Sequence, residues 1–252
     1  MSNPEHITES FIGSGKLFVD GRRLGNCSDV KLAYNLEKKT LPNFEGGGGN
    51  LNTIDRVTGV TLDLTCTQFS AENLAIALAA SITTVASAAV TDEAKIMAKH
   101  SMVDTDFMLD MTDAANVVVK TAGASPVTIP KVDNTGAANY EVTPAGIYFK
   151  GGADVIDATA IKVDYKKAPH YQIQALLASG REFKLVMDGI NDADGRPSVL
   201  RVWKWKPSPT DGLSFISDDF SNFTMKGEAL ADVTKPAGKS QFFELLKFKA
   251  AA

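Results

Sequence analysis

The sequence has few of the residues that build catalytic and metal centres. Its 252 residues include 2 cysteines and 3 histidines, and the motifs HExxH, CxxC and GxSxG are all absent. His6, His100 and His170 lie far apart in the chain, which does not match the ligand spacing of zinc sites. We therefore predict no catalytic residue, no metal site and no cofactor.

The two cysteines do not provide a disulfide framework. Cys66 falls in the apolar register of a predicted strand, where a buried thiol is the simplest interpretation, and we expect both Cys27 and Cys66 to be reduced. The first residues, MSNPEHITES, lack the basic start and apolar run of a secretory signal. This predicts synthesis in the cytosol.

Basic charge and a long apolar span are also missing. A net charge of −4 and a pI near 5.4 argue against a general nucleic-acid binder, which needs a basic patch to release phosphate counterions. Residues 73–91 are uncharged, but polar side chains interrupt them and no basic flank orients them. We expect a helix followed by a loop, and no membrane anchor. The interrupting residues are Ser81, Thr83, Thr84, Ser87 and Thr91.

Two long segments, residues 29–38 and 57–67, alternate between apolar and polar side chains. In the first, Val30 and Leu32 alternate with charged residues, and in the second Leu62 and Leu64 alternate with threonines and Asp63. A period of two is typical of strands in an antiparallel sheet with one buried face and one polar or solvated face. Between them, residues 41–52 form a glycine-rich connection that is too long for a tight turn.

A helix is predicted over residues 70–81. Ser70 is a suitable N-cap, Glu72 lies in the first turn, and Phe69 is spaced to pack against Leu74. The helix is too uniformly apolar for a solvated surface, so we expect it to pack across the sheets. Near the end of the chain, residues 191–197 predict the turn of a hairpin, and Trp203 and Trp205 are expected to share a strand face.

The chain is predicted to be mainly β, with two packed antiparallel sheets in a sandwich or barrel and the flanking helix near 70–81. We expect a flexible N-terminal arm at 1–15 and a core built from 16–111 and 169–252. Residues 112–168 contain short strand-like runs of small side chains and predict a β-rich insert.

The order of these features resembles the major tail tube proteins of phages with long non-contractile tails, a family related to contractile tail tubes and type VI secretion tubes. The resemblance lies in LGNCSDVKLAYNLEKKTLP, in the helix after TLDLTCTQFSAENLAIALAAS, and in the closing run that starts at KLVMDGINDADGRPSVLRVWKWKP. It implies a virion structural protein, made in the bacterial host cytoplasm, whose homohexameric rings stack into the tail tube. DNA would pass through without specific binding, and the tape measure, tail tip and terminator proteins would be partners.

The resemblance also assigns surfaces by position. Strands 29–38 and 57–67 would line the inner barrel, and the connection between them would contact the next ring. The candidates for the lumen are Asp29, Lys31, Asn35, Glu37, Thr61, Asp63, Thr65 and Thr67. The candidates for ring stacking are Phe44, Glu45, Gly46, Gly47, Gly48, Gly49 and Asn50.

Two other readings remain open at this point. One is another ring-forming tail or secretion component, such as a terminator. The other is a monomeric β-sandwich that binds carbohydrate or protein, for which exposed tryptophans at 203 and 205 would be the motive. Nothing in the residues favours an enzyme.

Overall fold

The computed structural model describes residues 13–248, and they fold as two compact units. Unit 1 contains the described residues up to 82 and from 173 onward, and unit 2 is residues 83–172. Strands make up 53% and helix 6% of the structure, in several antiparallel sheets with one small α-helix. The prediction of a mainly β fold with antiparallel sheets and a flanking helix is confirmed.

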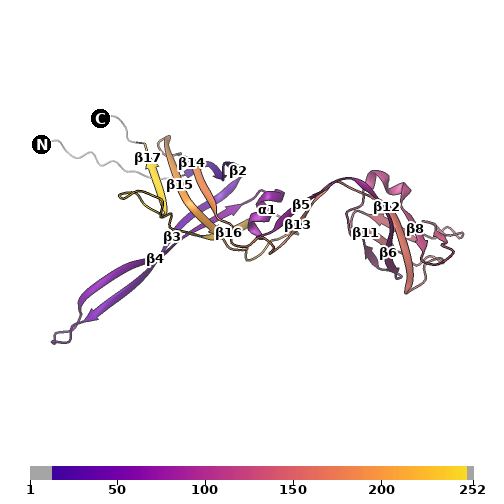
Figure 1. Ribbon diagram of the computed structural model, residues 1–252, viewed down its shortest axis with the longest axis horizontal. Helices are drawn as coiled ribbons and strands as arrows, with labels where there is room; N and C mark the ends of the chain where they lie inside the picture. The colour runs from indigo at the N-terminus through magenta and orange to yellow at the C-terminus, as the bar shows by residue number, and fades with distance from the viewer. Residues whose placement is uncertain (1–12, 249–252) are drawn as a thin grey trace. The chain divides into compact units, whose positions relative to one another are not determined.

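Unit 1 is built on one antiparallel sheet of eight strands, in the order β2-β1-β14-β15-β16-β4-β3, with β17 also paired to β15 (Figure 1). Leu17 and Leu62 come from strands far apart in this order and still share one core. The sheet therefore curls around its apolar side chains. The elements are β1 (Gly13–Val19), β2 (Arg22–Gly25), β3 (Cys27–Pro42), β4 (Asn50–Cys66), α1 (Ala71–Ala77), β14 (Phe183–Asn191), β15 (Arg196–Pro207), β16 (Phe223–Ala229) and β17 (Phe243–Lys247). Strands β5 (Ser81–Val85) and β13 (His170–Gln174) span the boundary between the units.

Strand β1 includes residues that the sequence predicts to lie in the flexible N-terminal arm. Of the predicted arm at 1–15, residues 1–12 lie outside the described residues, and Gly13 to Gly15 belong to β1, paired with β14. A side chain at Gly15 would meet the carbonyl oxygen of Asp188 at 2.6 Å, so the close approach of β14 requires glycine there. The start of β1 is therefore fixed by packing against β14.

Strands β3 and β4 pair antiparallel along almost their whole length. Val30 stands opposite Leu64 and Leu32 opposite Leu62, so their apolar positions share the core face, as the alternation predicts. Cys27 stands opposite Cys66 in the same ladder and is joined to it by a disulfide. The expectation that both thiols are reduced is wrong, because the register brings together two residues that are 39 positions apart in the sequence.

The helix α1 begins where the capping pattern predicts and ends earlier. The N–H of Asn73 donates to the Ser70 hydroxyl at 3.2 Å, which confirms the N-cap. The helix spans Ala71–Ala77, short of the predicted residue 81, and residue 81 already starts β5. Ile76 and Ala77 pack into the core of unit 1, and Phe69 meets Phe223 of β16 edge to face with ring centroids 5.0 Å apart.

Unit 2 has its own apolar core between two small antiparallel sheets, β6-β12-β8-β9 and β10-β11-β7. It is larger than the insert predicted at 112–168, because β6 and β7 also belong to it. The chain enters and leaves through β5 and β13, which pair with each other. Its elements are β6 (Ala88–Met97), β7 (Met102–Asp104), the 3-10 helix η1 (Met111–Asn116), β8 (Val118–Thr121), β9 (Thr128–Ile129), β10 (Tyr140–Thr143), β11 (Gly146–Phe149) and β12 (Thr159–Lys167).

Two polar clusters stabilise unit 2. The buried carboxylate of Asp133 accepts hydrogen bonds from the Thr135 hydroxyl at 2.7 Å and from the Ala153 N–H at 3.1 Å. These bonds, the first from Thr135, lower the pKa of Asp133 from 3.8 to about 2. On β6, Lys95 bridges Glu93 and Asp106 at 3.0 and 2.9 Å, which raises the pKa of Lys95.

Candidate assembly surfaces

The polar face of the unit 1 sheet carries most of the residues predicted to face a lumen. Register pairs Asp29 with Thr65 and Lys31 with Asp63, so these side chains share the face opposite to the core. Asp29, Lys31 and Asn35 are exposed, and the threonines and Asp63 on β4 are partly exposed. Whether this face lines a channel stays a prediction.

Two of the predicted residues lie at the margins of this face. Glu37 comes after the irregularity in the ladder between Asn35 and Leu36, where it pairs with Arg56 of β4 in the part of the ladder that β16 does not reach. Thr67 lies one residue beyond the end of β4, and its N–H and hydroxyl both bond to the Asn26 carbonyl. The structure therefore groups six of the eight candidates and places these two outside the group.

Strand β16 extends the polar face, which the sequence prediction missed. Thr224 stands beside Thr65 with their hydroxyl oxygens 3.0 Å apart, and Lys226 stands opposite Asp63. A hydrogen bond from Lys226 to Asp211 raises the pKa of Lys226. The alternation in FTMKGEA was the available signal, because every second residue from Phe223 to Ala229 is buried while Thr224, Lys226 and Glu228 are not. We call the group on β3, β4 and β16 the polar sheet face: Asp29, Lys31, Asn35, Thr61, Asp63, Thr65, Thr224, Lys226 and Glu228.

Beyond the polar sheet face, β3 and β4 continue as a two-stranded ribbon that leaves the sheet (Figure 1). Strand β16 pairs with β4 from Cys66 only as far as Val60. Past that point the ladder shifts register, and the hydroxyl of Thr58 donates to the Asn35 carbonyl at 3.1 Å. Residues 36–57, named the arm here, have no third strand beside them in the described structure.

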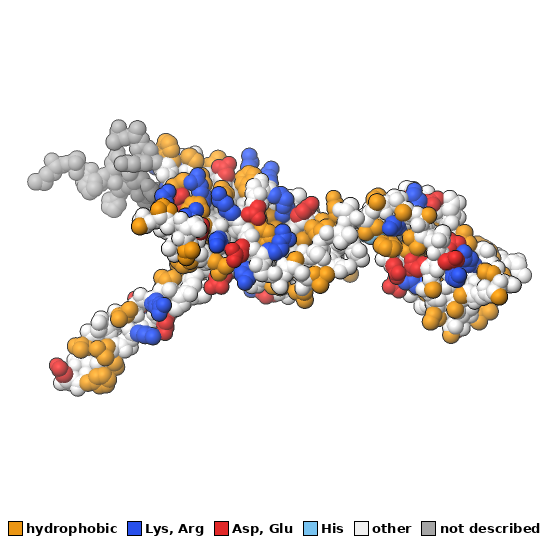
Figure 2. Space-filling model, in the orientation of Figure 1, with side chains coloured by type: hydrophobic (Ala, Val, Ile, Leu, Met, Phe, Trp, Pro, Cys, Tyr) orange, Lys and Arg blue, Asp and Glu red, His pale blue; other side chains and the backbone are white. Residues whose placement is uncertain are grey.

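The arm exposes apolar side chains on both of its faces. Leu36 pairs with Val57 and lies in line with the core positions of β3, but it is 65% exposed. Ile54 and Leu41 lie on the opposite face and are also exposed. Figure 2 shows hydrophobic side chains gathered toward the end of the arm. A two-stranded ribbon is marginally stable alone in water, so this arrangement favours a covering partner.

The tip of the arm contains the residues predicted for ring stacking. Gly46 to Gly49 have φ between +72° and +100°, which only glycine adopts without strain. The side chain of Asn43 organises the turn by donating to the Gly46 carbonyl at 2.9 Å and accepting from the Glu45 N–H at 2.9 Å. Phe44 is 84% exposed at the tip, and no other part of residues 13–248 covers it.

A second exposed apolar segment, loop 208–222, lies between β15 and β16 and was not predicted. Phe215, Ile216 and Phe220 are 78%, 96% and 94% exposed. The loop also contains Asp211, Asp218 and Asp219 and has no Lys or Arg. The sequence signal was the run LSFISDDF, whose apolar residues do not keep the period of a strand or a helix.

The two tryptophans do not share an exposed face. The ladder between β14 and β15 is irregular between Phe183 and Leu185, and this turns Trp205 into the core, where it is fully buried. Its indole N–H donates to the Leu62 carbonyl at 3.0 Å. Trp203 donates to the Ser240 carbonyl and lies under the Lys235 ammonium, 3.7 Å from its ring centroid. The prediction that the two tryptophans share a face was wrong. The argument for a carbohydrate-binding surface at these residues therefore no longer holds.

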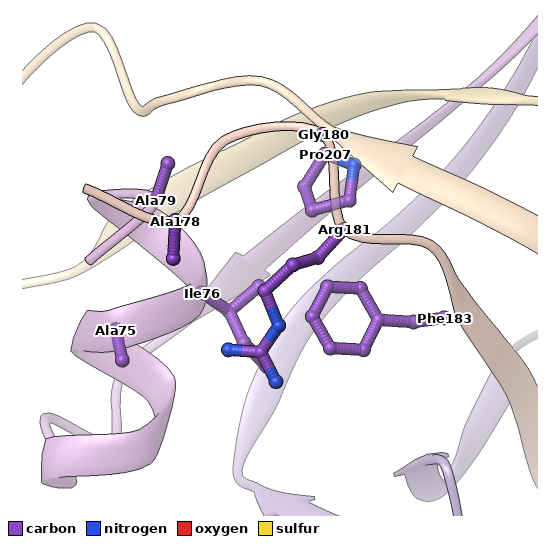
Figure 3. Close-up of a pocket in the computed structure, with 8 residues that line it drawn as sticks. All are labelled: Ala75, Ile76, Ala79, Ala178, Gly180, Arg181, Phe183 and Pro207. Atoms are coloured by element: carbon purple, nitrogen blue, oxygen red, sulfur yellow. The ribbon is translucent and has the colours of Figure 1, made fainter. Parts of the chain in front are cut away.

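A small cavity beside α1 offers no site for chemistry (Figure 3). Its volume is about 10 Å³, room for one water at most. Arg181 lies over the Phe183 ring, 5.1 Å from its centroid, and occupies the space between the helix and β14. The lining contains no carboxylate, hydroxyl, thiol or imidazole: it consists of Ala75, Ile76, Ala79, Ala178, Gly180, Arg181, Phe183 and Pro207.

Elsewhere in residues 13–248, no three His, Cys, Asp or Glu side chains come together as ligands for a metal ion. The pair Asp104 and Asp106 resembles a magnesium motif, but Asp106 is engaged by Lys95 at 2.9 Å. Among the described helices, none has the length and apolar character needed to cross a membrane.

Together, these features define a mainly β protein with two cores, a polar sheet face, and exposed apolar side chains on the arm and on loop 208–222. Residues 10–246 match the protein family described as Protein of unknown function UCP028589. Because the match covers most of the chain, the protein belongs to this family. No curated protein matches the chain.

Proposed function

We propose that this protein is a structural subunit of a phage tail tube, which assembles as stacked rings and forms the conduit for DNA ejection. The arm is the observation that carries the proposal. It projects beyond its own sheet, exposes apolar side chains on both faces, and ends in a glycine tip with Phe44 exposed. Its shape and chemistry suit insertion against another subunit.

The polar sheet face supports the same proposal. Charges of both signs alternate across neighbouring strands, as in the row of Lys31, Asp63 and Lys226. A face with balanced charge, rather than a basic patch, is suited to a channel that DNA passes through without being held. The hexameric ring and the tape measure, tail tip and terminator partners come from the family resemblance and are part of the proposal.

The free edge of β3 supports ring formation. Strand β3 is the last in its sheet and pairs only with β4, so backbone groups along its other edge have no strand partner in the described structure. Long exposed edges invite association with another chain. In a ring, a neighbouring subunit would cover this edge, and closure would leave no free edge to aggregate.

The test is assembly of the purified chain, followed by sedimentation velocity over a concentration series and by electron microscopy. We expect hollow tubes or stacked rings. Single rings that do not grow would favour a terminator-like component instead. Monomers at every concentration, in the presence of seeds of preformed tube, would overturn the proposal.

An arm variant shows whether the arm drives stacking. Leu36→Ser, Phe44→Ser and Ile54→Ser together remove exposed apolar groups from the arm. A matched control changes three exposed apolar residues of unit 2, Ile96→Ser, Val127→Ser and Ile156→Ser. Tubes should be lost in the arm variant and kept in the control.

A further inference from the structure

The arm and loop 208–222, which both expose apolar side chains, lie at opposite ends of the same strand pair. Strand β16 pairs with β4 from Phe223, opposite Cys66, to Ala229, opposite Val60. The arm leaves the sheet beyond Gly59, at the Ala229 end. Loop 208–222 leads directly into Phe223 and therefore lies at the other end.

Loop 208–222 is anchored so that its apolar side chains point outward. The N–H of Thr210 donates to the Ala77 carbonyl at the end of α1 at 2.7 Å, and its hydroxyl donates to the Thr224 carbonyl at 2.9 Å. Leu213 packs against the core of unit 1. With these residues held, Phe215, Ile216 and Phe220 remain in solvent although a core lies next to them.

We propose that loop 208–222 is the surface on which the arm of a second copy of this chain docks. This inference rests on the proposed function and names the receiving surface for the arm. A contact between different surfaces at opposite ends of a subunit is head to tail, and it repeats along an axis when successive copies are not rotated into a closed ring. Such a contact generates a stack.

The chemistry of the two surfaces fits a second copy as the occupant. The arm and loop 208–222 each expose large apolar side chains. Docking would remove from water apolar surface that neither segment buries within its own subunit. The loop has no basic residue, and of its three Asp, Asp211 is paired with Lys226 while Asp218 and Asp219 have no ion pair among the described residues. The arm presents Lys38 and Arg56, for which no ion pair is found among the described residues either. The arm is neutral in sum, so charge here sets orientation more than affinity.

The arm also projects well beyond its own sheet. Its seven residues from Leu36 to Pro42 extend about 23 Å beyond the sheet at the rise of a β-strand. That length carries Phe44 clear of its own core. The tip is therefore available to another copy without any rearrangement of unit 1.

The first experiment mixes two variants, each with one surface destroyed. The loop variant carries Phe215→Ser, Ile216→Ser and Phe220→Ser, and the arm variant is the one described above. Each variant alone should need about tenfold or more higher concentration to stack than the wild type. Mixed together, they retain one intact arm and one intact loop, so complexes should form that contain both variants and stop at a single junction.

The outcomes separate this inference from the proposed function. Normal tubes from the loop variant would overturn the docking surface and leave the tube proposal standing. Failure of the wild type to assemble on seeds would count against both. The unit 2 control variant should behave as the wild type, and near-native circular dichroism of the loop variant excludes misfolding as the reason for loss.

A second measurement does not depend on the fold of the loop variant. A photo-crosslinking amino acid in place of Phe44, in a mixture of ¹⁴N and ¹⁵N chains, reports which residues of another copy the tip touches. Crosslinks between differently labelled chains should fall within residues 208–222. Crosslinks confined to another part of the second copy, or none between chains at the highest concentration, would overturn the inference.

Discussion

Cys27 and Cys66 stand opposite each other at the ends of β3 and β4, with their Cα atoms 4.0 Å apart, and form a disulfide. Opposite residues of an antiparallel pair have closely spaced side chains, so the strand register alone brings the two sulfurs together. The bond ties the start of the edge strand β3 to the buried end of β4. It closes a loop that contains both strands and the whole arm.

Reduction of this disulfide should lower the free energy of unfolding. The disulfide joins residues with a sequence separation of 39 and so restricts the conformations of the unfolded chain. This restriction stabilises the folded protein by about 2–4 kcal/mol. Urea unfolding with and without reductant measures the difference. The double variant Cys27→Ser and Cys66→Ser should not respond to reductant. Alkylation of both cysteines in the denatured, unreduced protein would contradict the bond.

Leu36 and Leu62 provide a matched test of what the arm does. Both side chains lie on the core side of the β3–β4 ladder, but Leu62 is 0% exposed and Leu36 is 65% exposed. We expect Leu62→Ala to cost about 2–5 kcal/mol of stability because it leaves a cavity. Leu36→Ala should stay within about 0.5 kcal/mol and instead weaken association. Denaturant unfolding of the monomer, with sedimentation alongside, distinguishes the two effects.

Gly227 should tolerate no side chain. A Cβ at this position of β16 would lie 2.3 Å from the Trp205 indole nitrogen and 2.8 Å from the Lys206 carbonyl oxygen. Gly227→Ala should therefore destabilise the protein by about 1–3 kcal/mol and shift the emission of the buried Trp205. Gly212→Ala is the control, since nothing lies within 4 Å of a Cβ there. Equal stability of the two variants would contradict the close contact.

Asp133 should make unit 2 less stable in acid. Its pKa is about 2 in the folded protein against an ordinary 3.8, because the Thr135 hydroxyl and backbone N–H groups bond the ionised carboxylate. A lowered pKa contributes stability that is complete above 3.8 and is lost as the pH falls toward 2. Unfolding midpoints measured across this range should fall more steeply for the wild type than for Asp133→Asn. Asp104→Asn removes one exposed carboxylate from the same unit and serves as the matched control.

Unit 2 should fold as a separate fragment. It has its own core, which includes Phe149 and Ile161, both 0% exposed, and contains two sheets whose strands all lie within residues 83–172. We expect the fragment 83–172 to unfold cooperatively and to keep dispersed amide resonances. Loss of cooperative unfolding in this fragment would show instead that the core of unit 2 depends on unit 1. A fragment limited to the predicted insert, residues 112–168, lacks β6 and β7 and should not fold.

Local sequence determined the elements whose causes are local. Ser70 caps α1 because its hydroxyl and the Asn73 N–H are three residues apart, and this geometry is available before any tertiary contact forms. The alternation of Val30, Leu32 and Leu62, Leu64 specified which face of each strand is buried. The turn after Asn191 followed from its cluster of turn-forming residues, and the hairpin of β14 and β15 is confirmed.

Only the tertiary structure decided features that depend on register and on partners distant in sequence. The disulfide required knowing that Cys27 faces Cys66, and the burial of Trp205 required an irregularity in the pairing of β15 with β14. The boundary of unit 2 depended on β6 pairing with β12 across more than sixty residues of chain. The sequence by itself determined the strands, their buried faces and the helix start, because period and capping act over a few residues. The fold decided that β16 ends before β3 and β4 do, and this leaves the arm without a neighbouring strand. The exposure of a strand depends on how far the strands beside it extend.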